Sequence, residues 1–339
     1  MKLSTYVARR TIYVIFTIIG LSIFVFILAR VLPGDPARMM AGSTAPEYIV
    51  ERLREQLRLN KPLYEQYFYW VMDITRFDLG YSIYTRRSVT LDVMQYLPIS
   101  LELIFLSALF EIGGGFILGP IAGRYSYKWP DNFIRLLCYV GISLPAFVWA
   151  IILQLVFTFW IPVFPTQGFL DVAPPAHLTG LTMLDSLISG RFDAFVDVLK
   201  HMTLPALALA IPAFTQDARI IRSGMVENKE KDYITMALSR GLPEWVVTSK
   251  YLLKPSVIPA VTVMGLSIAS MMGNAFLVET VFSWPGFSKY GMNVMMNKDL
   301  NAIVAVVLII GVIYAVLNIV VDVIVAYLDP RIRLVEKGE

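Results

Sequence analysis

Six long apolar segments limit what this chain can fold into. They lie at about residues 11–31, 99–121, 133–160, 202–222, 256–279 and 302–328. Each is long enough to cross a hydrocarbon layer of roughly 30 Å, which takes about 20 apolar residues in a helix. Of the 339 residues 57% are hydrophobic and 16% are charged, against roughly 25% charged in a soluble domain. We therefore predict an all-α polytopic membrane protein with six transmembrane helices.

The distribution of basic residues predicts the orientation of these spans. Seven Lys and Arg residues lie between Arg219 and Lys254, three lie within the first ten residues, and the two shorter opposite loops hold two each. Short cytoplasmic loops are enriched in Lys and Arg, whereas long loops cross the membrane largely regardless of charge. We therefore expect both termini and the 219–254 region in the cytoplasm. The long stretch 32–98, which has eight basic residues, is expected outside.

This topology divides the chain into four stretches. They are an N-tail with the first transmembrane helix (1–31), an extracytoplasmic loop or cap (32–98), a core of five transmembrane helices (99–328) and a cytoplasmic tail (329–339). The first apolar run is too long for a signal-peptide core, so we interpret it as a retained span. Apolar residues at helical spacing in 46–59 and an aromatic cluster in 63–70 predict helices in the cap, and a further short helix is expected near Leu181–Leu187.

A polar insert, residues 223–255, separates the fourth and fifth apolar segments. Within it, Ile234, Ala237, Leu238 and Gly241 recur at helical spacing on one face. Gly241 is suited to end this helix, and Pro243 to the first turn of a second one. A small alanine and a glycine four residues apart let another surface approach the backbone closely. The spacing alone leaves open whether this is a docking unit or an ordinary loop with a solvated charged face.

The insert resembles the EAA loop of ABC-importer inner-membrane permeases, in which a helix-Gly-helix unit docks onto the ATPase subunit. Gly241 matches the family glycine and Ala237 its second alanine. Thr235 and Met236 stand where Glu and Ala would be, as is usual in the dipeptide/oligopeptide branch, whose form resembles DYxxxAxxxG. The resemblance implies six ATPase-docking residues, namely Asp232, Tyr233, Ala237, Gly241, Leu242 and Pro243.

The likeness covers nearly the whole chain, because further blocks follow in family order. They are Arg30–Pro36, Asp78–Gly80, Leu97–Leu103, Ser143–Phe147, His201–Leu207, Glu279–Gly286 and Asp329–Arg333. Together they resemble the B-type permease of the dipeptide/oligopeptide/nickel branch, the partner with the long first external loop. The block at Ser143–Phe147 implies a kink in the third span.

This resemblance implies the type I ABC importer permease fold and one half of a translocation pathway. The implied partners are a second, homologous permease in a heterodimer, two ATPase subunits and an extracytoplasmic solute-binding protein, all at the inner membrane. ATP and Mg²⁺ belong to the ATPases, and this chain is expected to bind no cofactor and no nucleic acid. Because the binding protein selects the solute, the substrate is poorly encoded here. Short peptides come first, oligosaccharides are the alternative, and nickel is the least favoured.

Several side chains within the spans are candidates for the pathway. Glu111 lies near the middle of the second apolar segment, where an unpaired charge costs about 2.5–3.5 kcal/mol on insertion scales. It must therefore face protein or water, either in an interhelix hydrogen bond or on the pathway. Ser270, Met271 and Asn274 are the other candidate lining residues, and Asn274 is alternatively a polar link between helices. Asp322 is expected to pair with a basic residue near the cytoplasmic face.

The sequence does not indicate an enzyme. The phosphate loop GxxxxGK[ST] and the motifs HExxH and GxSxG are absent, and no cluster of nucleophiles or acids points to a membrane enzyme, the rival class. We therefore expect a pore subunit without catalytic residues. His177 and His201 show no ligand spacing, and the single cysteine, Cys138, lies in an apolar run, so no metal site is expected.

Overall fold

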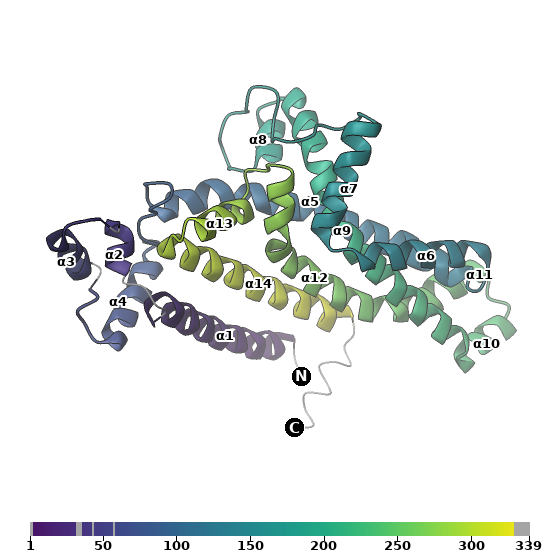
Figure 1. Cartoon of the computed structure of the whole chain (residues 1–339). Helices are drawn as coiled ribbons and strands as arrows, with labels where there is room; N and C mark the ends of the chain where they lie inside the picture. Colours follow the sequence, from purple (N-terminus) through teal and green to yellow (C-terminus); the bar gives the residue numbers. More distant parts are fainter. Residues whose placement is uncertain (1–2, 32–35, 43, 57, 329–339) are drawn as a thin grey trace.

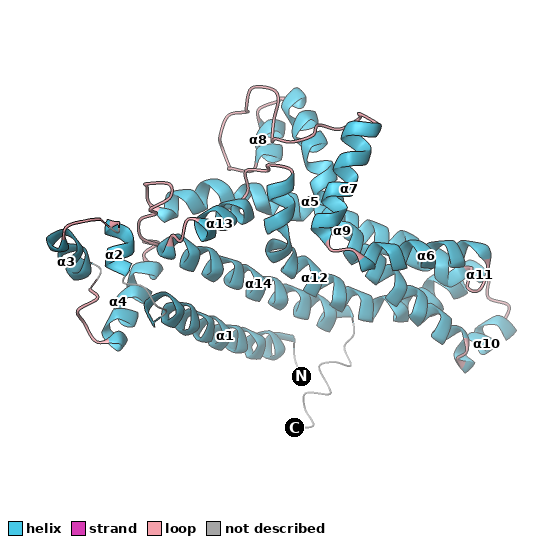
Figure 2. Cartoon of the chain, viewed as in Figure 1, coloured by secondary structure: helices cyan, strands magenta, loops and turns pink. Residues whose placement is uncertain are grey.

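The structure, a computed structural model, describes residues 3–31, 36–42, 44–56 and 58–328. These residues contain no strand, only an isolated antiparallel bridge between Tyr81 and Ser88, and the chain is an assembly of helices joined by loops (Figures 1 and 2). The prediction of an all-α polytopic fold is confirmed. The predicted tail 329–339 and residues 32–35 of the first matched block lie outside the described residues.

The helices follow one another along the chain with short connections. They are α1 (Leu3–Val31), α2 (Pro36–Ala41), α3 (Glu47–Gln56), α4 (Leu63–Thr75), α5 (Val89–Arg124), α6 (Trp129–Ser143), α7 (Ala146–Gln154), η1 (Leu155–Trp160), α8 (Thr182–Ile188), α9 (Phe192–Lys229), α10 (Asp232–Ser239), α11 (Glu244–Val246), η2 (Val247–Leu253), α12 (Lys254–Val281), α13 (Phe287–Met296) and α14 (Leu300–Leu328). The expected helices in the cap correspond to α3 and α4, and the expected outer helix corresponds to α8.

Among the described residues, five helical segments are long and apolar enough to cross a membrane, and a bent pair raises the number to six. The bent pair is α6 with α7 and η1, whose axes differ by 107°. The break falls at Leu144–Pro145, since a proline lacks the N–H that would continue α6 and disfavours helix in the residue before it. The kink expected in the third span is therefore present.

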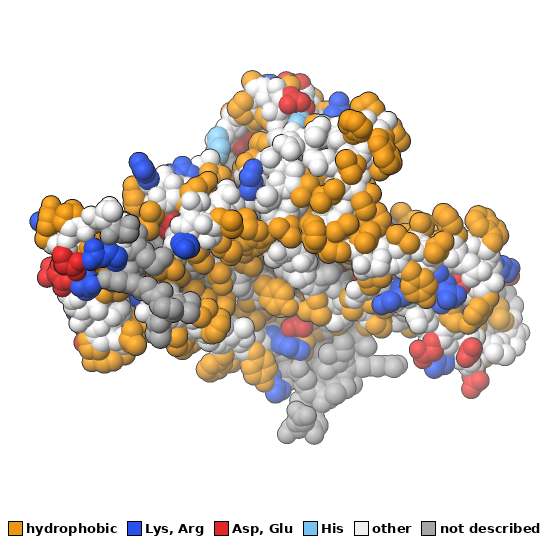
Figure 3. Space-filling model, viewed as in Figure 1, with side chains coloured by type: hydrophobic (Ala, Val, Ile, Leu, Met, Phe, Trp, Pro, Cys, Tyr) orange, Lys and Arg blue, Asp and Glu red, His pale blue; other side chains and the backbone are white. Residues whose placement is uncertain are grey.

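The helices reach beyond the apolar segments that predict them. α5 begins at Val89, within the stretch assigned to the external loop, and α9 is 38 residues long against an apolar core at 202–222. Hydropathy finds the apolar centre of such a helix but not its polar ends. In Figure 3 hydrophobic side chains cover broad areas of the visible face, and charged ones form groups at its left and right ends and smaller groups at the top and in the lower middle.

The largest helix–helix contact joins α5 to α9 and depends on glycine. Three glycines at i, i+4 and i+8 on α5 face three side chains at the same spacing on α9. A Cβ added at each would lie 2.7–3.0 Å from a side-chain atom of α9, closer than real Cβ contacts. The absence of side chains on α5 thus lets the two backbones approach, as in small-residue interfaces of membrane helices. The facing pairs are Gly115 with Asp217, Gly119 with Ile221, and Gly123 with Met225.

α1 lies antiparallel to α14 along one side of the core, and α14 in turn packs on α12 (Figure 1). Few residues of α1 are buried, and large apolar side chains such as Phe16 and Phe24 are more than half exposed, as expected of a helix that faces lipid. An ion pair of 3.4 Å between Arg10 and Asp322 joins the start of α1 to the end of α14. The prediction that Asp322 pairs with a basic residue is therefore confirmed.

We predict that Gly119→Ala will destabilise the chain while Gly113→Ala will not. The new Cβ at position 119 would lie 2.7 Å from the Ile221 side chain and 3.1 Å from the Ala218 carbonyl oxygen, so the helices must separate. Overpacking of this kind costs about 1–3 kcal/mol. Position 113, on the same helix, has no other atom within 4 Å of an added Cβ. The thermal unfolding midpoint of the purified chain in detergent measures both, and equal midpoints would contradict the packing argument.

Candidate functional site

The polar insert folds as two short helices around Gly241. α10 ends at Ser239, and Gly241 has φ = +73°, a left-handed conformation that suits glycine. The Gly241 N–H donates to the Leu238 carbonyl (2.9 Å), and the Leu242 N–H donates to the Ala237 carbonyl (3.3 Å). These two bonds are those of a Schellman helix end. The predicted helix-Gly-helix is present, although Pro243 precedes α11 as its N-terminal cap residue and lies outside its first turn.

One face of the insert packs against the two long helices that flank it. Ile234 and Ala237 are 5% and 4% exposed and belong to one apolar cluster with Val247, with Met225 of α9 and with Met264 of α12. Ala237 thus contributes its small side chain to packing within this chain. Through this cluster the insert is fixed to the ends of α9 and α12, so a force on the insert acts on both helices.

The opposite face of the insert carries exposed apolar side chains. Met236, Leu238 and Trp245 are 55%, 52% and 69% exposed, and Tyr233 is 40% exposed while donating a hydrogen bond to Asn228 Oδ1 (2.8 Å). Leu238, expected on the same face as Ile234 and Ala237, is more than half exposed whereas those two residues are buried. Met236 and Trp245 are not among the six predicted docking residues. Each is a large apolar residue within a polar insert, and this could have indicated an exposed apolar contact surface.

A hollow of about 620 Å³ lies where the bend of α6 and α7 meets α9 and α12. Pro145 and Phe147 line it from the bend, Gln216 lines it from α9, and α12 supplies polar and flexible side chains. Three of the four candidate lining residues, Ser270, Met271 and Asn274, lie in this wall. Among the described residues of the wall none is charged, so the surface combines apolar groups with neutral hydrogen-bonding groups.

Glu111, the fourth candidate, lies behind this wall. Its side chain is fully buried and accepts a hydrogen bond from Ser267 Oγ, and Ser267 itself borders the hollow. The fully buried Asp217 carboxyl group faces Glu111 from α9. Two carboxylates side by side repel each other unless a proton or cation lies between them. The structure therefore shows the interhelix hydrogen bond that was one of the two alternatives, and a role for Glu111 in transport stays a prediction.

Two known protein families match this chain. Residues 115–334 match the family described as binding-protein-dependent transport system inner membrane component, and residues 3–104 match the N-terminal family of the same membrane components. The chain belongs to this family. It is a multi-pass inner-membrane permease and a transport component, not an enzyme.

Several named relatives match this permease over almost its full length. The probable D,D-dipeptide transport system permease protein DdpB of Escherichia coli (strain K12) is 37% identical over 94% of this chain and 94% of its own length. The dipeptide transport system permease protein DppB of Alkalihalophilus pseudofirmus is 33% identical over 97% and 99%. The glutathione transport system permease protein GsiC of Escherichia coli (strain K12) is 31% identical over 97% and 98%.

One block that carried the family resemblance is a structural junction in this permease. Glu279 is fully buried and accepts hydrogen bonds from Ser100 Oγ of α5 and from the Lys289 N–H (2.7 Å) of α13. A Cβ at Gly286 would clash with Ser100 Oγ and the Glu279 carboxylate, so glycine is needed there for close approach. Trp284, also fully buried, packs in the main core cluster. Glu279–Gly286 thus joins α5, α12 and α13.

We predict that thiol reagents reach the wall of the hollow but not the layer behind it. In a Cys138→Ala background, Ser270→Cys and Asn274→Cys should react with a small polar maleimide, because both positions are exposed in the hollow. Glu111→Cys should stay unlabelled until the protein is denatured, because position 111 is fully buried. Mass spectrometry of intact protein gives the labelled fraction. Rapid labelling at position 111 would place Glu111 in the wall itself.

Proposed function

We propose that this permease forms half of the translocation pathway of an ATP-driven importer for short peptides, which a solute-binding protein delivers. The observation that carries the proposal is the geometry of the insert. A left-handed Gly241 joins its two short helices, the inward face is packed on α9 and α12, and the outward face is apolar and exposed. An exposed apolar patch of this kind on a polar segment marks a protein interaction site.

A second permease is proposed because the hollow is incomplete in a single chain. Its wall includes Phe147 and Leu277, which are 36% and 44% exposed. A related subunit that covers these apolar residues would turn the hollow into an enclosed path. We further propose two ATPase subunits, which bind ATP and Mg²⁺ and dock on the insert, and an extracytoplasmic binding protein on the opposite side of the membrane.

The proposed mechanism is alternating access driven through two helices. Closure of the ATPases on nucleotide moves the insert, and the insert is packed on the end of α9 and the start of α12. The same two helices supply Gln216 and Asn274 to the wall of the hollow. Displacement of one shared element therefore changes the shape of the path, as in other domain movements between two states.

Short peptides are the proposed substrate, and oligosaccharides are the alternative. The names of the relatives favour peptides and related small molecules, namely D,D-dipeptides, dipeptides and glutathione. The neutral wall of the hollow suits weak, unselective contacts with peptide groups or hydroxyl groups alike. Nickel is disfavoured because no histidine or carboxylate belongs to the described wall. Uptake of labelled dipeptide against labelled disaccharide, in vesicles with the partner binding protein, distinguishes the two classes.

We predict that Gly241→Val will weaken recovery of the ATPases. A β-branched residue at φ = +73° strains the backbone by about 1–2 kcal/mol and places bulk beside the outer face of the insert. Gly190→Val is a matched control, because Gly190 also has a positive φ (+68°) and open space around it but lies between α8 and α9. Co-purification of the ATPases and uptake in vesicles are the measurements. Full ATPase recovery and wild-type uptake with Gly241→Val would remove the docking assignment.

The orientation of the permease is tested by two single cysteines. Asn60 lies beside α4 and Ser239 ends α10, and both side chains are exposed. In a Cys138→Ala background, a membrane-impermeant thiol reagent added to intact cells should label Asn60→Cys and should label Ser239→Cys only after permeabilisation. The reverse pattern would invert the proposed topology, and with it the docking of the insert to cytoplasmic ATPases.

A further inference from the structure

We infer that His201, Asp171 and Asp197 form a binding site for a divalent transition-metal ion of the Zn²⁺ class. His201 and Asp197 lie on α9, and Asp171 lies on the loop between η1 and α8. One ligand atom from each of the three residues lies within 4.8 Å of the others. The inference concerns the end of α9 opposite to the insert and does not depend on the proposed transport function.

The imidazole of His201 is positioned to act as a metal ligand. Its side chain is 2% exposed, and Nδ1 lies 2.9 Å from the Asp197 carbonyl oxygen, which can only accept a hydrogen bond. Nδ1 therefore donates the hydrogen bond to this carbonyl, and Nε2 is the nitrogen left for a metal ion. Among the described residues Nε2 has no hydrogen-bond partner although it is buried. Metal-binding histidines have this arrangement, in which a backbone carbonyl fixes one nitrogen and leaves the other for the ion.

The carboxylate of Asp171 lies at the open side of this nitrogen. Asp171 Oδ2 is 3.7 Å from His201 Nε2, too far for a hydrogen bond. Two ligands of a tetrahedral zinc ion, with bonds of about 2.0–2.2 Å, lie roughly 3.3–3.5 Å apart. The separation thus needs only a small adjustment to hold an ion. The Asp171 side chain is 78% exposed, which leaves room for water as further ligands and a path by which the ion enters.

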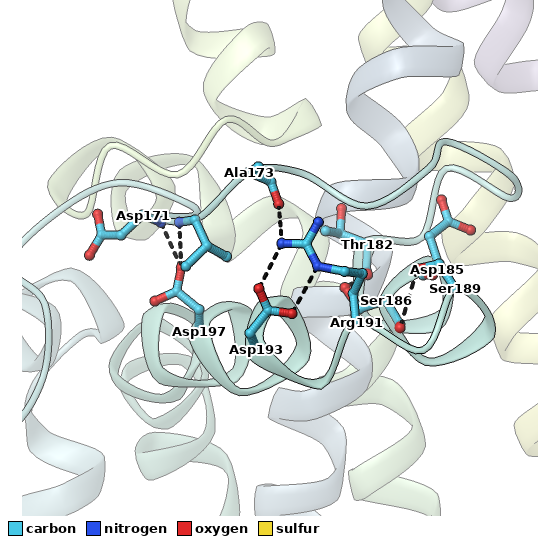
Figure 4. Close-up of polar contacts among 10 residues, drawn as sticks. Asp171, Ala173, Thr182, Asp185, Ser186, Ser189, Arg191, Asp193 and Asp197 are labelled. Atoms are coloured by element: carbon cyan, nitrogen blue, oxygen red, sulfur yellow. Dashed lines mark hydrogen bonds and ion pairs between the residues drawn. The ribbon is translucent and has the colours of Figure 1, made fainter.

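Asp197 holds the loop in position and supplies the second carboxylate of the cluster. Its Oδ2 accepts hydrogen bonds from the backbone N–H groups of Asp171 (2.6 Å) and Val172 (3.4 Å), as Figure 4 shows. Its Oδ1 lies 3.6 Å from His201 Nδ1. One imidazole with two carboxylates favours a borderline ion such as Zn²⁺ over Ca²⁺ or Mg²⁺, which prefer all-oxygen sites.

The charge around the cluster is not balanced by protein cations. In the part of the chain that the structure describes, no Lys or Arg forms an ion pair with Asp171 or Asp197. Arg191, drawn in Figure 4, is held by the Asp193 carboxylate (2.7 and 2.9 Å) and by the Ala173 carbonyl (3.2 Å). Two carboxylates without a Lys or Arg partner in the described residues therefore attract a cation from solution.

Asp185, another acidic group in this region, does not compete for the ion. Its carboxylate accepts hydrogen bonds from the backbone N–H groups of Leu178, Thr179 and Gly180. Burial opposes its ionisation, but these hydrogen bonds outweigh burial and keep the pKa of Asp185 below its ordinary value. A carboxylate with all its partners already in the protein gains little from a metal ion, in contrast to Asp171.

The site would fasten the loop that follows η1 to the start of α9. At present Asp197 reaches this loop through hydrogen bonds to its backbone. A bound ion adds a side-chain link from Asp171 to His201, and His201 is buried in the helix layer. Binding to the folded state alone then stabilises the chain in proportion to the logarithm of the free metal concentration.

The test is zinc titration of the full-length chain, purified in detergent and stripped with a chelator, in a Cys138→Ala background that removes the thiol. Isothermal calorimetry with ZnCl₂ should show one ion per chain. D171N should bind at least about 10-fold more weakly, since the loss of even a supporting group costs 10–100-fold. H201Q should bind still more weakly, and X-ray absorption of the loaded wild type should show one imidazole in the zinc coordination shell.

Two matched controls make the test specific. H177Q removes the only other histidine, which is exposed on the same loop, and D193N removes a carboxylate of α9 that lies outside the cluster. Both should retain wild-type affinity. Because Asp171 is exposed, D171N leaves the packing intact even if H201Q unfolds. No zinc binding by the background chain, unchanged affinity in D171N, equal loss in H177Q, or displacement of Zn²⁺ by equimolar Ca²⁺ would each overturn the site.

Discussion

Close approach of α5 to α9 is the contact on which the rest of the structure depends. Three glycines on one face of α5 leave no side chain between the two backbones, and the facing side chains of α9 occupy the space. Between membrane helices the lipid gives no hydrophobic driving force, so tight van der Waals packing has to supply the stability. The α5–α9 pair then serves as a frame. α6 and α7 pack against α9, and α12 packs against the same helix.

Buried acidic groups occur where helices of this frame meet. Glu111 and Glu279 form hydrogen bonds between helices, and neither belongs to the wall of the hollow. Glu111 accepts a hydrogen bond from Ser267 of α12, and Glu279 accepts hydrogen bonds from groups on α5 and α13. Burial of such groups without partners costs several kcal/mol, and both Glu111 and Glu279 are tied to specific neighbours. The wall of the hollow, in contrast, is neutral over its described residues. This separation suits a pathway that must release its solute as readily as it accepts it.

The sequence predicts elements whose signals are local. The apolar segments and the helix end at Gly241 follow from a few neighbouring residues, the kink at Pro145 follows from a short block that resembles the family, and the structure contains all of them. Contacts between distant residues could not be predicted in this way. The spacing of the two histidines does not predict that Asp171, on a loop 30 residues before His201, lies beside the His201 side chain. Similarly, helical spacing grouped Leu238 with Ala237, whereas the packing of α10 against η2, which contacts α9 and α12, buries Ala237 and leaves Leu238 more than half exposed.

One helix, α9, connects these features from end to end. Asp197 and His201 lie near its start, Gln216 in its middle borders the hollow, and its last turns carry the cluster that holds the insert. A helix of 38 residues is about 57 Å long at 1.5 Å per residue, so it extends well beyond a hydrocarbon layer of roughly 30 Å. Because the glycine contacts fix it to α5 over about two turns, α9 cannot bend freely within that region. In the proposed mechanism, movement of the insert is therefore passed along α9 and α5 as one body, and the proposed change in the hollow arises where this body meets α12 and the bend of α6 and α7.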